Sequence, residues 1–241
     1  MLPYFRDIMS TVWAVIGEGF SSATIIPGIT TTDDVVWWFR EKIRELGYDT
    51  WFQTSVNVFR RGVPTSFSGI IQRGDMIWCD IGFSAFNLHT DTQHVGYVLR
   101  ENETDVPQGF KNGLGTANTM QDILMRQIQV GRTGNEVLAS SRAEMTSRGI
   151  TGTFYSHPVN DYGHGSGPLI GYVNIQTPVP VRGDIKIIPS MWYSVELQAT
   201  VQVPEWGNQA IEFRQEEDMQ IDANGENHWI FGRQTEFHLI H

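Results

Sequence analysis

The segment GDMIWCDIGFSAFNLHTDTQHVGYVLR, residues 74–100, contains two strand-like runs, and each run contains one aspartate. The first run is apolar around Asp80, and the second, which contains Asp91, is also β-prone. A turn centred on Ala85 and Phe86 would place Asp80 opposite Asp91. Opposed side chains have Cβ atoms about 4.5–5.5 Å apart, where like charges repel. A divalent cation would offset that repulsion, and the alternative is a hairpin whose carboxylates point into solvent.

A second hairpin is predicted near the C-terminus. IIPSMWYSVELQATVQV and AIEFRQEEDMQI are strand-like, and PEWGNQ between them is typical of a turn. A turn centred on Trp206 and Gly207 would place Glu196 opposite Glu217. Between the two hairpins lies YGHGSGPLIG, where glycines around His164 let backbone and ligand approach closely.

These residues form an oxygen-rich set with one imidazole, which suits two hard or borderline divalent ions bridged by carboxylates. Taken singly, the histidine is typical of a loop and each carboxylate of a solvated surface. Their order along the chain is the specific feature. The candidate metal ligands are Asp80, Asp91, His164, Glu196 and Glu217.

From about Thr31 to the C-terminus, the chain resembles the pita-bread (M24-type) metallopeptidases, which include methionine aminopeptidases, Xaa-Pro aminopeptidases and prolidases. DIGFSAFNLHTD, YGHGSGPLIG, SVELQA and EEDMQIDANGE parallel the motifs of that family. The resemblance implies an α+β fold, with an antiparallel sheet, helices packed outside it and internal pseudo-symmetry. It implies that Asp80 binds one metal, that His164 and Glu196 bind the other, and that Asp91 and Glu217 bridge them. Glu216 is the weaker alternative to Glu217, because the family's ligand directly precedes an aspartate.

The outer residues depart from the family pattern. Arg61 stands where methionine aminopeptidases have a substrate-contacting histidine. Proline-directed members have histidines four residues before and seven residues after the metal histidine, and here Asn160 and Gly171 stand there. His157 lies seven residues before His164 and is a candidate for the same purpose. His94 replaces the arginine that usually ends the Asp-x-Thr-Arg motif.

The resemblance implies hydrolysis of a peptide or amide bond near a substrate N-terminus, with two divalent ions (Mn, Co, Zn or Fe) as cofactors. The expected specificity is that of an Xaa-Pro aminopeptidase rather than a methionine aminopeptidase. Glu196 or Glu217 is the expected base, and His157 or His89 the expected donor to the oxyanion. For the two histidines, a loop position and a half-exposed strand position are the respective alternatives.

Two other functional classes stay open. One is a metal-free pita-bread protein that acts as a binding module, or a creatinase-like enzyme that hydrolyses a C–N bond without metal. The other is a metal-loaded homologue whose altered outer residues have abolished turnover. Metal analysis combined with a peptide assay separates these alternatives.

The composition agrees with a single catalytic domain over residues 1–241, without a creatinase-like N-terminal domain. Hydrophobic residues make up 40% and charged residues 18%, which excludes a disordered chain. The formal charge of −10 would still be acidic with two bound ions, which argues against nucleic acid as a partner. The expected partner is a peptide or dipeptide, with no membrane association, and a homodimer is left open.

Cys79, the single cysteine, excludes an internal disulfide. The N-terminus lacks a basic region before its apolar stretch, which favours the cytoplasm unless a preceding segment carried a targeting signal. Four helices are expected, over residues 3–16, 32–46, 116–129 and 133–149. The last begins with the capping box Thr133-Gly134-Asn135-Glu136.

Overall fold

The computed structural model describes residues 1–159 and 163–241 and has an α+β architecture. The helices are α1 (Leu2–Gly19), α2 (Thr32–Glu45), α3 (Gln108–Gln127) and α4 (Gly134–Ser147), with short 3-10 turns η1 (Arg182–Asp184) and η2 (Pro204–Trp206). The strands of the first half are β1 (Asp49–Thr50), β2 (Ser55–Phe59), β3 (Met76–Ile81), β4 (Phe83–Ala85), β5 (Leu88–His89) and β6 (Thr92–Val98). Those of the second half are β7 (Thr151–Phe154), β8 (His157–Pro158), β9 (Trp192–Ser194), β10 (Leu197–Val203), β11 (Gln209–Gln215), β12 (Asp218–Ile221), β13 (Asn227–Trp229) and β14 (His238–Ile240).

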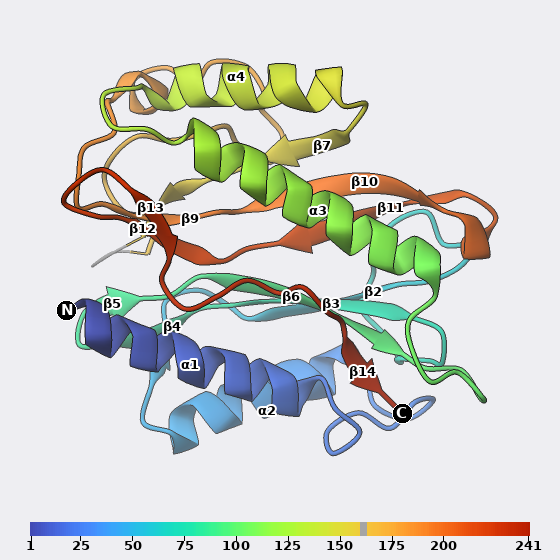
Figure 1. The fold of residues 1–241 in the computed structure, drawn as a ribbon. Helices are drawn as coiled ribbons and strands as arrows, with labels where there is room; N and C mark the ends of the chain where they lie inside the picture. The colour runs from blue at the N-terminus through green and yellow to red at the C-terminus, as the bar shows by residue number, and fades with distance from the viewer. Residues whose placement is uncertain (160–162) are drawn as a thin grey trace.

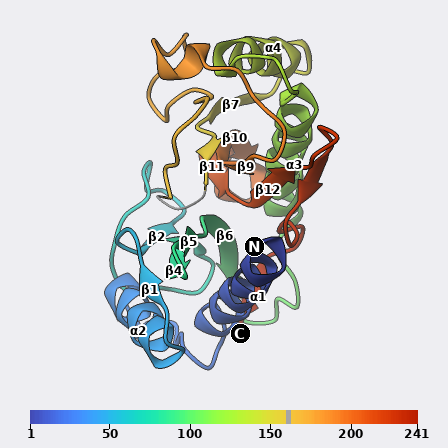
Figure 2. The ribbon, with the colours of Figure 1, turned by 90° about the vertical axis from the view of Figure 1, so that its left-hand side faces the viewer.

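The strands form two stacked halves with helices packed against each (Figure 1). In the lower half of that view, α1 and α2 pack against the sheet β14-β6-β3-β2, in which only β14 runs parallel to its neighbour β6. In the upper half, α3 packs against the sheet β11-β10-β7, and α4 lies beyond it. The sheet β13-β12-β9-β8 and the small sheet β1-β4-β5 lie at one end of the molecule (Figure 2).

The alternation of side chains along β3 explains how the two halves are joined. Ile77 and Cys79 point into the cluster that contains α1 and α2, whereas Met76 and Trp78 belong to the cluster built around α3. Successive strand residues point to opposite faces. Asp80 therefore lies on the face of β3 that is turned towards the second half of the molecule.

The four helices occur where the sequence predicts them, with one difference in extent. Thr31 and Thr133 begin α2 and α4 with complete capping boxes. In each box the threonine hydroxyl accepts a hydrogen bond from the backbone N–H of the acid three residues on, and the carboxylate of that acid accepts one from the backbone N–H of the threonine. Helix α3 begins at Gln108, eight residues before the predicted start at 116. Its first half is rich in glycine, which lowers the helix propensity of that segment.

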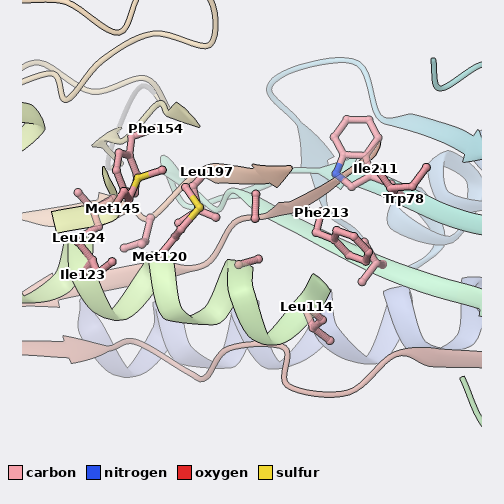
Figure 3. Packing of buried hydrophobic residues seen from close by; sticks show 14 of the residues in the cluster. Trp78, Leu114, Met120, Ile123, Leu124, Met145, Phe154, Leu197, Ile211 and Phe213 are labelled. Carbon is pink, nitrogen blue, oxygen red and sulfur yellow. The ribbon is translucent and has the colours of Figure 1, made fainter. Parts of the chain in front are cut away.

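Tertiary packing overrides that low propensity. Gly113 lies against the ring of Phe213 on β11, and a Cβ atom at this position would overlap that ring. Leu114, Met120, Ile123 and Leu124 of α3 belong to the same buried cluster as Phe213 and Leu197 (Figure 3). Helix α3 is thus stabilised by burial of its apolar face rather than by local preference.

Both predicted hairpins form, but each has a different register from the predicted one. Strand β3 pairs with β6 so that Asp80 faces Gln93, because the turn lies at Phe86 and Asn87, both of which have positive φ. Strand β10 pairs with β11 so that Leu197 faces Gln215. Continued by one pair, this register would set Glu196 opposite Glu216. An isolated bridge between Gln93 and Glu216 joins the two halves at this point.

Candidate metal centre

Acidic side chains from both halves converge with two histidines where the halves meet. Asp80, Asp91 and Glu216 offer oxygen atoms that all lie within 4.8 Å of one another. His157, Glu196 and Glu216 form a second such group, which shares Glu216 with the first. A third group consists of Asp91, His157 and His164. The overlap of these groups makes one continuous cluster.

Asp80 and Asp91 come together despite the shifted register. Asp80 faces Gln93 instead of Asp91, and these two residues of the second strand run are two positions apart. Residues two positions apart lie on the same face of a sheet, so Asp91 lies diagonally beside Asp80. Burial raises the pKa of both carboxyl groups well above the usual range, and the charge of nearby Glu216 raises them further. The backbone N–H of Asp91 donates to Asp218 Oδ2 over 3.1 Å, which fixes this end of β6 against β12.

In the second hairpin, the one-residue change of register exchanges two neighbouring glutamates. A slip of one residue turns every side chain to the opposite face. Glu216 is therefore in the cluster, and Glu217, which the sequence analysis preferred as the bridging ligand, is outside it. Glu217 accepts hydrogen bonds from Trp13 Nε1 (3.2 Å), His94 Nε2 (2.8 Å) and the backbone N–H of Gln234 (3.0 Å). Glu217 thus belongs to a buried hydrogen-bond network that includes Trp13 of α1.

His157, expected as an outer donor, is the histidine among the carboxylates. Its ring is fully buried, and Nε2 lies 3.5 Å from Asp91 Oδ2, 3.7 Å from Glu216 Oε1 and 3.9 Å from Glu196 Oε2. Nδ1 lies 3.2 Å from the carbonyl oxygen of Pro158, which can only accept. A donor at Nδ1 suits this acceptor, and Nε2 faces the acidic oxygens.

His164, expected as the metal ligand, lies at the rim of the cluster. Its ring stands edge-on to His157 at 4.4 Å and to Trp51 at 5.0 Å, and Tyr155 places its hydroxyl 3.5 Å from Nε2. Burial, together with the neighbouring His157, lowers the pKa of His164 to about 4. The structure thus brings both histidines together: His157 lies among the carboxylates, and His164 belongs to the group that also contains Asp91.

The remaining sequence candidates lie apart from the carboxylates. His89 on β5 forms a 2.6 Å hydrogen bond between Nδ1 and Ser84 Oγ, and its ring is 6.1 Å from that of Trp51. His89 is in none of the acid–histidine groups found among residues 1–159 and 163–241. Arg61 is exposed, and Asn160 lies outside the described residues.

Comparison with known proteins places the chain in a family. The profile of Metallopeptidase family M24 matches residues 7–223. The chain belongs to this family. A search of curated proteins found no match.

Solved structures of family M24 type share the fold at low sequence identity. The X-Pro aminopeptidase of Thermotoga maritima has a TM-score of 0.71 at 18% identity, over 94% of this chain and 59% of that one. The Xaa-Pro dipeptidase of Bacillus anthracis has a TM-score of 0.69 at 19% identity, over 95% and 59%. The methionine aminopeptidase of Rickettsia prowazekii has a TM-score of 0.62 at 14% identity, over 90% and 92%. The chain thus has the pita-bread fold and spans about three fifths of the first two proteins.

The residues present fit the divalent metal ions on which family M24 depends. Among the described residues, Asp80 Oδ1 and His157 Nε2 are buried polar atoms without a hydrogen-bond partner. Buried polar atoms are nearly always paired, and a divalent cation would provide a partner for both of these atoms. Carboxylate oxygens with one imidazole nitrogen are a donor set for Mn²⁺ and similar ions. Apart from His164 at the rim, the set that converges is Asp80, Asp91, His157, Glu196 and Glu216.

Several residues around this M24 site were missed by the sequence analysis. A cavity of about 240 Å³ next to Asp80 and Glu196 is also lined by Trp78, Gln93, Tyr155 and Arg214. Two of these residues, Gln93 and Arg214, could have been predicted from the correct register of the hairpins. Gln93 faces Asp80 across the first hairpin, and Arg214 shares a strand face with Glu216, two residues further on.

None of the helices within the described parts of the chain is long and apolar enough to cross a lipid bilayer.

Proposed function

We propose that the protein is a peptidase that uses two divalent metal ions to hydrolyse the bond near a substrate N-terminus, with Xaa-Pro peptides as substrates. The observation that carries the proposal is a set of overlapping groups that joins two buried acids (Asp91 and Glu216) and two half-buried acids (Asp80 and Glu196) to His157. Its Nε2 has no hydrogen-bond partner among the described residues. Residues 1–241 act as one catalytic domain in this proposal, and a profile match over residues 7–223 supports it.

The five converging residues would hold the ions. Asp80 and Asp91 would hold one ion and His157 and Glu196 the other, and Glu216 belongs to both groups. Bound divalent ions lower the pKa of water and polarise a carbonyl group. All remaining steps use the side chains of the chain itself.

Proton transfer is assigned to Glu196. Its Oε1 accepts a hydrogen bond from Gln93, which leaves Oε2 to take a proton from the attacking water and return it to the leaving amine. Burial raises the pKa of this carboxyl group in the metal-free chain. Glu217, the alternative base, is turned away and bonded to three donors.

His164 and Tyr155 are placed to donate to the substrate carbonyl. They lie beside His157 without being among the buried acids, and both are polar groups at the rim of the site. Hydrogen-bond donors that face the developing oxyanion stabilise the transition state. In this proposal, His164 therefore takes the role for which the sequence analysis named His157 and His89.

Two observations favour Xaa-Pro substrates. With His157 as the metal histidine, His164 stands seven residues after it, which is the interval of the proline-directed members. Arg214 lines the cavity beside the acids, with its guanidinium 4.8 Å above the Trp78 ring. This guanidinium also pairs with Glu212 over 2.6 Å, and a cation beside the proposed metal ligands suits the carboxylate of a short substrate.

Metal content and peptide hydrolysis test the proposal together. Protein prepared with Mn²⁺, Co²⁺ or Zn²⁺ is analysed for bound metal and assayed with Ala-Pro, Ala-Pro-Ala, Met-Ala-Ala and dipeptides without proline. We expect two ions per chain, cleavage before proline, loss of activity with chelator and recovery on adding metal back. Two bound ions without cleavage of any peptide would instead support an inactive homologue.

One pair of variants distinguishes the centre from a second acid–histidine group on the surface, formed by Asp222, Glu226 and His228. Asp91→Asn should lose at least one ion, because it removes an anionic ligand that is 3% exposed. Asp222→Asn should keep both ions and full activity. The opposite pattern would assign the metal to the surface group and overturn the proposal.

A further inference from the structure

Gln93 is a buried amide that links carboxylates on two different segments of the second half. Its Nε2 donates to Glu196 Oε1 over 2.9 Å and to Glu216 Oε2 over 2.7 Å. The carboxylate that precedes β10 is thereby tied to the one that follows β11. Gln93 itself is on β6, in the first half, and is 3% exposed.

The indole of Trp78 fixes which way this amide points. Trp78 Nε1 donates to Gln93 Oε1 over 3.0 Å, and an indole nitrogen can only donate. The amide oxygen must therefore face Trp78, and the NH₂ group must face the two carboxylates, which only accept when ionised. The flipped amide would set donor against donor on one side and acceptor against acceptor on the other.

The backbone of Gln93 reinforces this placement. Its N–H donates to the carbonyl oxygen of Glu216 over 3.1 Å, and the return bond from Glu216 to Gln93 measures 3.3 Å. The second oxygen of Glu216 accepts the hydroxyl of Ser194. Both oxygens of Glu216 are thus oriented by protein donors, while their remaining lone pairs face the cluster.

We propose that Gln93, held by Trp78, is a positioning residue that aligns Glu196 and Glu216 and thereby sets the affinity of the centre for the ion bound by Glu196. This inference rests on the proposed function. A residue that orients a metal ligand through a hydrogen bond typically contributes a factor of about 10–100 to metal affinity. Gln93 orients two ligands at once, and its amide adds no charge to an already anionic site.

Calorimetric titration of metal-free protein with Mn²⁺ tests the proposal, with Gln93→Leu as the main variant. Leucine keeps the volume of the side chain but removes the donors to both glutamates. We expect one of the two Mn²⁺ ions to bind about 10–100-fold more weakly. Gln202→Leu on β10 is the matched control, because Gln202 is exposed on a strand and should leave both affinities unchanged.

Trp78→Phe tests the orientation of the Gln93 amide without changing Gln93 itself. Phenylalanine keeps an aromatic face for Arg214 but has no N–H to orient the amide, so we expect a loss in the same direction and smaller. Trp206→Phe is its control, because Trp206 is 4% exposed and its Nε1 has no hydrogen-bond partner among the described residues. This variant also decides the question if Gln93→Leu does not fold.

Electron paramagnetic resonance of the Mn²⁺-loaded protein supplies a readout that a general loss of stability would not change. At one equivalent of Mn²⁺ per site, the wild type should show a spin-coupled pair, and Gln93→Leu should show isolated Mn²⁺. Unchanged affinities and a coupled pair in both folded variants would overturn the role of Gln93. A wild type that binds no Mn²⁺ at all would instead overturn the proposed function.

Discussion

At the scale of single residues, the two histidines have different surroundings and should have different effects when they are replaced. His157→Asn removes the nitrogen that faces three acids, so we expect loss of at least one ion. His164→Asn removes a group at the rim, so we expect metal content to be kept and kcat to fall by about 10²–10³. Metal analysis and kinetics on the same preparations measure both effects.

The reverse result would restore the assignment made from the sequence. If His164→Asn lost metal and His157→Asn kept it, the exposed histidine would be the ligand. Loss of metal in both variants would show that the rim histidine supports the site structurally. The two readouts therefore separate a ligand from a donor to substrate.

The sequence named Asp80, Asp91 and Glu196, which the structure brings together, but it preferred Glu217 to Glu216 and gave His157 an outer role. Glycines around His164 suggested close approach of a ligand, whereas His157 is directed inward by its short strand β8. Glu216 and Glu217 are adjacent, so only the register decides which of them faces the cluster. Local sequence patterns do not determine the strand register, because the register depends on the number of residues in the turn.

At the scale of elements, turn geometry explains both differences of register. The first turn lies at Phe86 and Asn87, one residue later than predicted, and asparagine tolerates positive φ well. In the second, residues 204–208 connect β10 and β11 through the turn η2, with Gly207 left-handed. A loop with an odd number of residues pairs Leu197 with Gln215 and turns Glu216 inward.

Two glycines of α3 give a test of how tertiary packing overrides helix propensity. Gly113→Ala should destabilise the protein by about 1–3 kcal/mol, because the new methyl group overlaps the ring of Phe213. Gly115→Ala has open space around the site and should stabilise by about 0.5–1 kcal/mol, as alanine does in a helix interior. Denaturant unfolding with metal removed measures both. Equal stabilisation by both substitutions would show that α3 does not pack closely on β11.

At the scale of the whole molecule, the proposed centre lies where the two halves of the chain meet. Burial raises the pKa of Asp80, Asp91 and Glu196, so the folded chain without cations disfavours their ionised forms. The acids come from both halves of the chain, which explains why no single segment of sequence could establish the site. Bound cations would stabilise the ionised acids and hold the halves together.

A pair of histidines, His94 buried and His238 half-buried, links the stability of the whole fold to pH. His94 Nδ1 lies 3.0 Å from His238 Nε2, which connects β6 to the C-terminal strand β14, and His94 also bonds to Glu217. Burial lowers the pKa of each of these histidines to about 3. Both rings are therefore neutral in the folded protein at pH 5, whereas unfolded histidine, with a pKa near 6.5, is charged there.

The sign of the effect follows from the protons bound in each state. Between about pH 3 and 6.5 the unfolded chain binds more protons at these sites, so stability falls as the pH falls. His238→Gln removes one of the two sites and keeps an N–H donor for His94. In saturating Mn²⁺, the wild type should lose up to about 2 kcal/mol more than His238→Gln between pH 7 and pH 5. Unfolding by denaturant at the two pH values measures this difference, and the comparison cancels any loss of metal common to both proteins. Parallel pH dependences for the two proteins would show that His238 is already charged, or exposed, in the folded state.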